Sequence, residues 1–374
     1  MLYDGEDECV LSYCEKETRL NDICPYFTRY ELGFPMAFLH PAVKEDRVLD
    51  PFCGSGTSLF AARLAGLYAV GIDSNPVAVV VARAKLANVS IADVVERAVS
   101  VLKGGETDLP VSEDPFWERC FSRETLVALT RLRAHFSHGI KDDADVFLAA
   151  LVSGVLHGPG VSVRRRYLSN EMPASFAPER ERLLEYWTHA RLQPPNLDVL
   201  DLLEARTRHL LDLSPGPGKG RALVADSRVR ATYGEEDFFD RVVTSPPYFG
   251  LNTFVSDQWL RMWLLGNPDE AGAQICQEDP GAYVRDLALV WRHCAAVCRS
   301  GAQMAIRFGL TSTYSHLDSR DLLLSSLLLA DAGWHVESLK AVPPSKPFPA
   351  VPAVFCPPAD RPVAEITLLA QLLV

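Results

Sequence analysis

The sequence predicts an α/β protein whose doubly wound sheet has seven strands and is interrupted by a mainly helical insertion. Three observations lead to this fold class. Near the start, an apolar strand, a glycine loop, a helix and a second strand follow one another closely, which is the order of a mainly parallel sheet. The middle of the chain has helical periodicity and little strand signal. The last part returns to alternating strands and helices.

The first α/β part has clear start and stop signals. Gly66 follows an apolar helical stretch and is typical of a helix end. Asn75 is suited to cap the next helix, and Pro76 fits its first turn. The elements expected here are strands 47–49 and 68–72 and helices 58–65 and 76–87.

The helical middle, residues 91–215, is expected to be an insertion into a catalytic domain made of residues 1–90 and 216–374. Its end is marked by a loop rich in glycine and proline, residues 214–220. The helices expected within it are 92–102, 123–136, 144–156, 179–190 and 197–213.

The second α/β part completes the sheet. It is expected to contribute five strands, two of them near the C-terminus, and three helices. The strands are 222–225, 241–244, 303–308, 334–340 and 363–369, and the helices are 257–265, 283–299 and 320–332.

Composition narrows the functional classes. The 374 residues carry a net charge of −11, which argues against a protein that coats nucleic acid non-specifically but allows one basic face. The nine cysteines form no CxxC pair, so neither a disulfide framework nor a zinc site is expected, and no metal is predicted. No apolar run reaches the length of a membrane span, and the acidic N-terminus does not resemble a signal peptide. We therefore expect a cytoplasmic protein that does not bind membranes.

A glycine loop follows the first strand, in the string Asp-Pro-Phe-Cys-Gly-Ser-Gly-Thr that ends at Thr57. Glycines at this place permit unusual backbone angles and close approach to a ligand. The third glycine of a dinucleotide fingerprint and the Gly-Lys-Ser/Thr of a P-loop are both missing. Asp73, at the end of the second strand, is placed to accept hydrogen bonds from ribose hydroxyls. Asp50 either orients the loop or faces a cationic group of the ligand.

A second motif, Ser245-Pro246-Pro247-Tyr248, follows the strand 241–244, where ligands of α/β proteins bind. An exocyclic amine of a nucleobase is a poor nucleophile because its lone pair is delocalised into the ring. Two acceptors aimed at its hydrogens, the Ser245 hydroxyl and the Pro246 carbonyl, would localise that lone pair. The prolines make the array rigid, and Tyr248 offers a ring on which the base stacks. A base in a duplex must be flipped out to reach such a site.

The two motifs together resemble those of the DNA amino-methyltransferases, the cytosine-N4 and adenine-N6 enzymes of restriction-modification and defence systems. The glycine string is similar to their motif I, the segment ending at Asp73 to motif II, residues 225–227 to motif III, and Thr-Ser-Pro-Pro-Tyr to catalytic motif IV. Phe34-Pro35 resembles motif X, and residues 257–266 resemble motif V. The order of the motifs departs from the family pattern, because the insertion precedes motif III.

The resemblance implies a class I methyltransferase fold, which is Rossmann-like, and S-adenosyl-L-methionine as the cofactor. The cofactor-binding residues that it implies are Phe34, Pro35, Asp50, Pro51, Phe52, Cys53, Gly54, Ser55, Gly56, Thr57, Asp73, Ser74, Asp226 and Ser227. The catalytic residues are Ser245, Pro246, Pro247 and Tyr248.

Serine before Pro-Pro-Tyr is commoner in the cytosine-N4 group, whereas Asp or Asn is commoner in the adenine-N6 group. Methyl transfer to cytosine N4 in double-stranded DNA is therefore the favoured interpretation. Three alternatives stay open: an adenine-N6 DNA methyltransferase, an RNA methyltransferase that acts on guanine N2, and an inactive DNA-binding component of a defence complex. A cognate restriction endonuclease or another defence protein is the partner expected for the enzyme.

Target recognition is expected in the insertion, where an arginine run precedes a short polar stretch. Arginines of such a run hold phosphates or enter a groove, and the alternative is a solvated loop. The DNA-binding residues expected are Arg164, Arg165, Arg166, Tyr167 and Asn170.

Overall fold

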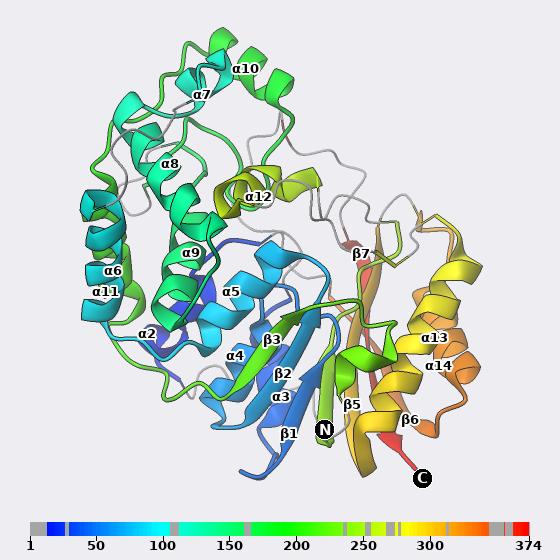
Figure 1. Ribbon diagram of the computed structural model, residues 1–374. Coiled ribbons are helices and arrows are strands. Elements are labelled where there is room, and N and C mark those ends of the chain that lie inside the picture. Colours follow the sequence, from blue (N-terminus) through cyan, green and yellow to red (C-terminus); the bar gives the residue numbers. More distant parts are fainter. Residues whose placement is uncertain are drawn as a thin grey trace.

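The computed structural model describes residues 13–26, 30–104, 112–160, 166–234, 238–250, 256–266, 274–275, 278–311, 314–343, 355 and 362–373. Figure 1 shows a twisted sheet with helices on both sides and a group of helices beyond one end of it. None of the described helices combines the length and the apolar character that crossing a membrane requires.

Within the described residues the sheet has seven strands in the order β3-β2-β1-β4-β5-β7-β6. The strands are β1 Arg47–Asp50, β2 Tyr68–Asp73, β3 Gly220–Val224, β4 Phe239–Thr244, β5 Cys298–Thr311, β6 Trp334–Val342 and β7 Pro362–Leu372. β7 is antiparallel to β5 and β6, and the strands from β3 to β5 pair in parallel. This is the arrangement of the class I methyltransferase fold, so the predicted fold class is confirmed.

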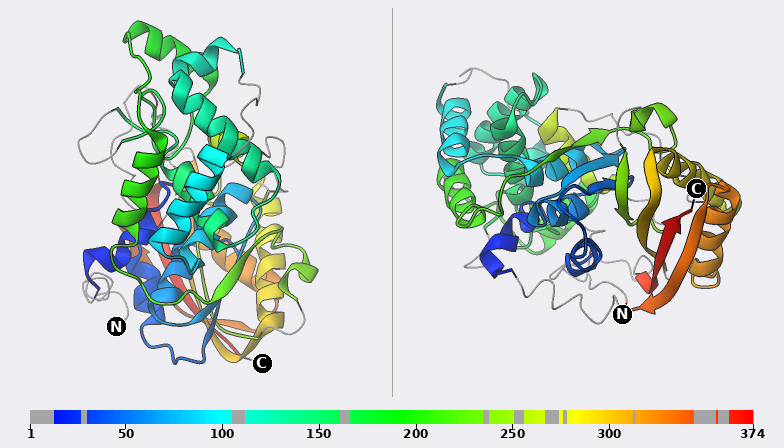
Figure 2. Two further views of the ribbon diagram at one scale, coloured as in Figure 1. Left: turned by 60° about the vertical axis from the view of Figure 1, so that its left-hand side comes forward. Right: turned by 90° about the horizontal axis from the view of Figure 1, so that it is seen from below.

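Alternate residues of the strands pack on opposite faces of the sheet, as a period of two requires. Leu49 and Val242 belong to the core that includes α13 (Pro280–Val297) and α14 (Ser319–Ala330). Their neighbours Val48 and Val243 belong to the core that includes α3 (Gly33–Leu39), α4 (Thr57–Leu64) and α5 (Pro76–Leu86). Figure 2 shows α13 and α14 on the side of the sheet away from α3.

The described residues between α5 and β3 form helices and no strand. The helices are α6 Ile91–Gly104, α7 Pro115–Cys120, α8 Arg123–Ser137, α9 Asp143–Val155, α10 Arg180–His189 and α11 Val199–Leu210. Five of them match the predicted helices, and α7 is additional. Its signal is present in the sequence, since Asp114 caps the helix and Pro115 occupies its first position. The short helix α3 was not predicted either, because all seven of its residues are buried and it shows no amphipathic period.

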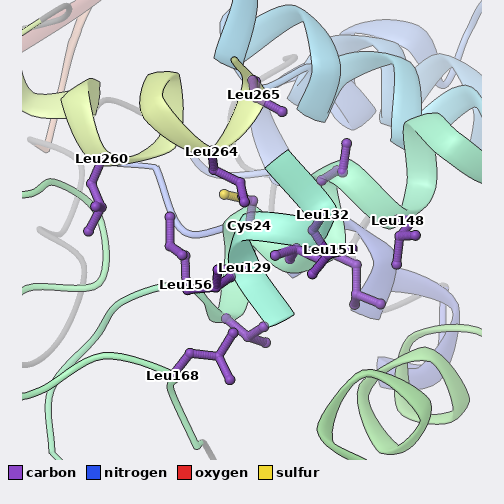
Figure 3. Close-up of a cluster of buried hydrophobic side chains, with 14 of the residues drawn as sticks. Cys24, Leu129, Leu132, Leu148, Leu151, Leu156, Leu168, Leu260, Leu264 and Leu265 are labelled. Atoms are coloured by element: carbon purple, nitrogen blue, oxygen red, sulfur yellow. The ribbon is translucent and has the colours of Figure 1, made fainter. Parts of the chain in front are cut away.

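The insertion packs against the α/β part rather than forming a separate core. Figure 3 shows leucines of α8, α9 and α12 (Trp259–Leu265) converging on one cluster together with Cys24. The same cluster contains side chains of α5 and α6. α12 follows the Ser-Pro-Pro-Tyr segment in the chain and ends at Gly266, as predicted. The helix that comes after this segment therefore carries the interface with the insertion.

A buried arginine holds together the two points where the insertion leaves and rejoins the sheet. The guanidinium of Arg63 donates to the carbonyl oxygens of Lys85 and Ala87 at 2.8 and 2.9 Å, at the end of α5. It also donates to the carbonyl of Gly216 at 2.8 Å, in the loop that precedes β3. One side chain thus satisfies backbone acceptors on both connections.

A second buried arginine, Arg261 of α12, anchors the middle of the insertion. Its guanidinium donates to the carbonyl oxygens of Ser153 at 3.1 Å and Ala174 at 2.7 Å, and to the side chain of Gln258 at 2.7 Å. Ser153 lies in α9, and Ala174 belongs to the irregular segment that precedes α10. Arg261 therefore fixes the position of α12 relative to the insertion.

His157 is buried in this same region. Its Nδ1 lies 2.7 Å from the Pro173 carbonyl oxygen, so Nδ1 carries the hydrogen and donates it. Burial and, to a smaller extent, the nearby Arg261 cation lower the pKa of His157 to about 3, and the Pro173 hydrogen bond acts against this shift. The imidazole is therefore neutral in the folded protein.

The exchange Arg261→Met is expected to lower the free energy of unfolding by roughly 3 kcal/mol or more, because buried carbonyls lose their donors. Urea denaturation measures this loss. Arg208→Met is the matched control, since Arg208 pairs with Glu204 at the surface of α11 and should change stability by about 0.5 kcal/mol or less. Equal effects of the two exchanges would contradict the anchoring role of Arg261.

The neutral state of His157 makes stability depend on pH. Below about pH 6.5 the unfolded chain binds a proton at this residue, whereas the folded chain does so only near its pKa of about 3. The contribution of neutral His157 to the free energy of unfolding is thus fully present above pH 6.5. It is lost as the pH falls, by at most about 1.4 kcal/mol per pH unit. His157→Asn keeps a donor for Pro173 and removes this dependence. The stability difference between wild type and variant, measured by urea denaturation from pH 8 to pH 5, should shrink as the pH falls; a constant difference would refute the assignment.

Candidate active site

The two motifs found in the sequence lie at the carboxyl ends of adjacent strands. β1 pairs with β2 on one side and with β4 on the other, so the strand order reverses between β1 and β4, the point at which open α/β sheets bind ligands. The glycine loop follows β1 and the Ser-Pro-Pro-Tyr segment follows β4. A hydrogen bond joins them directly: the Thr244 hydroxyl donates to the Asp50 carboxylate at 2.5 Å.

The glycine loop is shaped by backbone conformations that only glycine adopts without strain. Gly54 and Gly56 have φ values of +48° and +78°. A Cβ at Gly56 would lie 2.7 Å from the Cα of Ala82 in α5, whereas a Cβ at Gly54 would meet nothing within 4 Å. Gly56 therefore allows α4 and α5 to approach each other, and the backbone at Gly54 has open space beside it.

Asp73 holds this loop to the end of β2. Its carboxylate accepts the backbone N–H of Gly54 at 2.9 Å with one oxygen and that of Asn75 at 2.9 Å with the other. Burial raises the pKa of Asp73, and the two N–H groups act against that rise. Each carboxylate oxygen keeps a further lone pair, so Asp73 can accept two more hydrogen bonds from a ligand.

Asp50 is fully buried and orients the loop, which is one of the two roles that the sequence left open. Besides Thr244, it accepts the backbone N–H of Phe52 at 3.0 Å, the Ser58 hydroxyl, and the Tyr30 hydroxyl at 3.5 Å. Burial raises the pKa of Asp50 to about 6, while the hydrogen bonds from Ser58, Thr244 and Phe52 counteract that rise. These donors make a buried carboxylate tolerable.

The other residues expected to bind the cofactor lie around the same loop. Pro51, Cys53, Ser55 and Thr57 are buried, while Phe52 and Ser74 are half-buried. The Ser227 hydroxyl donates to the Pro51 carbonyl, which ties the segment after β3 to the loop. The Thr57 hydroxyl is buried and has no hydrogen-bond partner within the described part of the chain.

Asp226 forms an ion pair with Arg228. Arg228 donates to both of its carboxylate oxygens, at 2.8 to 3.2 Å, and also to Asp286 at 3.0 Å. Burial pushes the pKa of Asp226 up, but the hydrogen bonds from Arg228 outweigh this and hold the pKa below its ordinary value. Asp226 is therefore an ionised residue at the edge of the site whose carboxylate is held in place.

The Ser-Pro-Pro-Tyr segment is fixed against β5 and α13. The Tyr283 hydroxyl donates to the Pro247 carbonyl at 2.5 Å, and Phe249 forms a parallel bridge with Leu310. The Tyr248 ring meets the Phe308 ring edge-on at 5.9 Å. Ser245 and Pro247 are half-buried and Pro246 is buried. The segment is thus a rigid element built on the sheet rather than a surface loop.

An arginine and a glutamate near Tyr248 were not singled out in the sequence. Arg307 of β5 and Glu365 of β7 are buried and form an ion pair at 3.8 Å. Burial raises the pKa of Tyr248 well above its ordinary value, Glu365 raises it further, and Ser245 and Arg307 lower it. Tyr248 therefore stays protonated. These charges lie within two expected strands that carry no motif, so only the pairing of β5 with β7 reveals them.

The motif X residues lie in α3, which covers the sheet beside this pair. The Phe34 ring is buried, and the Arg307 guanidinium stands 4.5 Å from its centroid. The Tyr30 ring meets Phe34 edge-on at 5.4 Å, and Pro35 is buried in the first turn of the helix. Phe34 thus connects the glycine-loop carboxylate Asp50, through Tyr30, with the ion pair of β5 and β7.

The residues expected to bind DNA differ in their surroundings. Arg164 and Arg165 lie outside the described residues, and Arg166 is exposed. Tyr167 is buried against Gly158. Asn170 is also buried, and its side chain donates to the Arg119 carbonyl at 3.0 Å and accepts the Glu171 N–H at 2.9 Å. Tyr167 and Asn170 therefore shape the base of this segment, and Arg166 is the described member with a side chain that faces solvent.

Among the described residues, no group of three or more His, Cys, Asp or Glu side chains is arranged to hold a metal ion.

Comparison with known proteins points to methyltransferases. The Type II methyltransferase M.MvaI of Kocuria varians is 27% identical over 258 residues, which are 59% of this chain and 51% of that protein. The chain thus spans about half the length of this curated relative. No protein-family model matches the chain.

Solved structures that align with this chain share little sequence identity with it. TrmN from Thermus thermophilus aligns over 91% of this chain and 49% of its own, with a TM-score of 0.34 and 12% identity. A SAM-dependent methyltransferase from Methanosarcina mazei aligns over 90% and 97%, with a TM-score of 0.35 and 10% identity. The rRNA methyltransferase AviRa from Streptomyces viridochromogenes aligns over 93% and 88%, with a TM-score of 0.34 and 11% identity. Scores of this size say nothing about activity.

Gly56→Ala is expected to destabilise the protein more than Gly66→Ala does. Both residues have positive φ, +78° and +74°, but a Cβ at Gly66 would meet nothing within 4 Å. The control thus measures the backbone strain alone, about 1–2 kcal/mol, and Gly56→Ala adds the overlap with Ala82, about 1–3 kcal/mol more. Urea denaturation of both variants provides the comparison, and equal losses would show that the close approach of α5 is unimportant.

Proposed function

We propose that this protein is an S-adenosyl-L-methionine-dependent methyltransferase that modifies the exocyclic N4 of cytosine in DNA, within a restriction-modification or defence system. One observation carries the proposal: the Thr244–Asp50 hydrogen bond joins the start of the Ser-Pro-Pro-Tyr segment to the start of the glycine loop. A nucleoside-binding loop and an array of acceptors for an amine then meet at one edge of the sheet. The similarity to M.MvaI supports methyl transfer as the reaction.

The glycine loop fits the proposed cofactor. Asp73 has lone pairs for two ribose hydroxyls, the backbone at Gly54 has open space beside it, and the buried Thr57 hydroxyl lacks a partner within the described residues. Asp50 holds the loop, and Phe34 with Pro35 covers this edge of the sheet from α3. When bound, the cofactor supplies an electrophilic methyl group on a sulfonium.

The Ser-Pro-Pro-Tyr segment fits an exocyclic amine. The Ser245 hydroxyl and the Pro246 carbonyl would accept the two amine hydrogens and localise the nitrogen lone pair. Because Tyr283 holds the Pro247 carbonyl and Phe249 pairs with Leu310, these acceptors are preorganised. Tyr248 stays protonated and offers its ring to the flipped base. Positioning of the amine then supplies much of the rate.

Ser245 favours cytosine-N4 over adenine-N6 as the target, because serine before Pro-Pro-Tyr is commoner in the cytosine-N4 group. The RNA alternative, transfer to guanine N2, and an inactive component of a defence complex would share the same fold. For the proposed enzyme, the insertion (residues 91–215) is the target-recognition domain, and the exposed Arg166 with Arg164 and Arg165 contacts the DNA. A restriction endonuclease or another defence protein is the expected partner.

Expression in a host that lacks this modification, followed by mass spectrometry of its digested DNA, tests the proposal. The wild-type protein should produce N4-methylcytosine, and Ser245→Ala and Tyr248→Ala should each reduce the product at least about 100-fold. Ser325→Ala, on the exposed side of α14, is the control and should leave the product unchanged.

Calorimetry with S-adenosyl-L-methionine separates binding from transfer. Ser245→Ala should keep the cofactor affinity of the wild type, because its role lies on the amine. N6-methyladenine or N2-methylguanine as the product would establish one of the alternatives. A protein that binds the cofactor and leaves DNA unmodified in every host would favour the inactive component.

A further inference from the structure

We propose that Arg307, held by Glu365, recognises the target cytosine by donating two hydrogen bonds to its N3 and O2. The inference rests on the proposed function and deepens it, because it assigns the choice of base to residues outside the known motifs. The observations that carry it are the place of the Arg307–Glu365 pair beside Tyr248, and two buried hydroxyls on the same two strands that have no partner among the described residues.

Strand register places Arg307 next to the amine-binding segment. Thr244 pairs with Ile306 at the end of the parallel ladder of β4 and β5, so Ser245 and Arg307 are the residues that follow this last pair. Arg307 and Glu365 both act electrostatically on Tyr248 of the same segment. On the other side of β5, Arg307 pairs with Thr367 and Gly309 pairs with Glu365. Directly paired residues, and residues two apart along one strand, point to the same face of a sheet. Arg307 and Glu365 are therefore diagonal neighbours on one face, which brings the two charges together.

The two strands that carry the ion pair, β5 and β7, also carry two buried hydroxyls. Thr311 and Thr367 are 1% and 0% exposed, and their hydroxyls have no hydrogen-bond partner within the part of the chain that the structure describes. Thr311 lies beside Gly250, just after the Ser-Pro-Pro-Tyr segment, since a Cβ there would be 3.3 Å from its hydroxyl. Buried hydroxyls without partners are costly. Their presence indicates that this wall of the site faces a polar ligand.

The chemistry of the guanidinium matches cytosine. While Ser245 and Pro246 take the N4 hydrogens, the same edge of the base presents two adjacent acceptors, N3 and O2. A guanidinium offers parallel N–H donors at a matching spacing. Adenine, with its N6 hydrogens in the same position, presents the single acceptor N1 followed by a C–H. Arg307 would therefore discriminate between the two amino bases.

Glu365 makes this arrangement compatible with methyl transfer. The N4 nitrogen gains positive charge as the methyl group arrives, and an isolated cation nearby would oppose that change. The Arg307–Glu365 pair is neutral as a unit and so avoids this opposition. A buried ion pair contributes little net stability, which agrees with a role in recognition.

Arg241 offers a matched control at the other end of the same sheet face. It pairs with Asp46 at 3.1 Å and stands 5.7 Å from the ring of Phe38 in α3. Arg307 pairs with Glu365 and stands over Phe34, one helical turn earlier. Both arginines thus link an acid to α3, but Arg241 lies at the amino-terminal ends of the strands, away from the motifs.

The test combines enzyme variants with a base analogue. After the modified site has been mapped in host DNA, oligonucleotides carry either cytosine or 3-deazacytosine at the target position. The analogue keeps the amine and O2 but lacks the N3 acceptor. For the wild type and for Arg241→Met, kcat/KM should fall roughly 10- to 100-fold with the analogue. For Arg307→Met, kcat/KM on cytosine should be low, and the analogue should change it less than about threefold.

The outcomes are distinct. Equal sensitivity of Arg307→Met and the wild type to the analogue would refute the contact and leave the proposed function intact, whereas a wild type that forms no N4-methylcytosine would refute the function itself. If Arg307→Met fails to fold, as judged by circular dichroism and cofactor calorimetry, the double variant Arg307→Met/Glu365→Met replaces it, because apolar replacement of a buried pair is commonly tolerated. The same insensitivity to the analogue is expected of it, and retained sensitivity would overturn the inference.

Discussion

The hydrogen bond from the Thr244 hydroxyl to the buried Asp50 carboxylate is the contact on which the site depends. The ladder between β1 and β4 ends at the pairing of Leu49 with Val242, so beyond it the two strands are joined through side chains. Asp50 continues the connection and also holds Phe52 and Ser58, at the start of the glycine loop and of α4. Because its pKa is raised only to about 6, the carboxylate is mostly ionised at neutral pH and accepts all of these hydrogen bonds.

Local signals made the fold and the two motifs predictable. Asn75 and Pro76 mark the start of α5 as expected, and all seven strands lie where the apolar runs predicted them. The position of the Ser-Pro-Pro-Tyr segment beside the glycine loop could also be foreseen, since the carboxyl ends of parallel strands share one edge of the sheet. Short-range rules suffice for these features because each depends on a few consecutive residues.

Features that depend on pairing between distant strands could not be predicted. Arg307 and Glu365 meet because β7 is inserted between β5 and β6, and nothing near either residue in the sequence indicates this. The buried state of Tyr167 and Asn170 is a second example. Their polar side chains after an arginine run suggest a surface loop, yet Asn170 satisfies the backbone of Arg119 and Glu171. The residue type determines which groups a side chain can bind, whereas the fold determines which of them lies next to it.

The arginines of this acidic chain fall into groups with different tasks. Arg63, Arg261 and Arg307 are buried, and the first two are engaged by backbone carbonyls that hold the insertion to the sheet. Other arginines are paired with acids at the surface, such as Arg180 with Asp114. Arginines that are buried or paired with an acid add little to the attraction of a phosphate backbone. For a DNA substrate, attraction to phosphates must then come from local exposed cations such as Arg166, and selectivity must come from contacts to the bases themselves. A recognition element buried beside the Ser-Pro-Pro-Tyr segment, as proposed for Arg307, is consistent with that division, because its contribution does not depend on the overall charge of the protein.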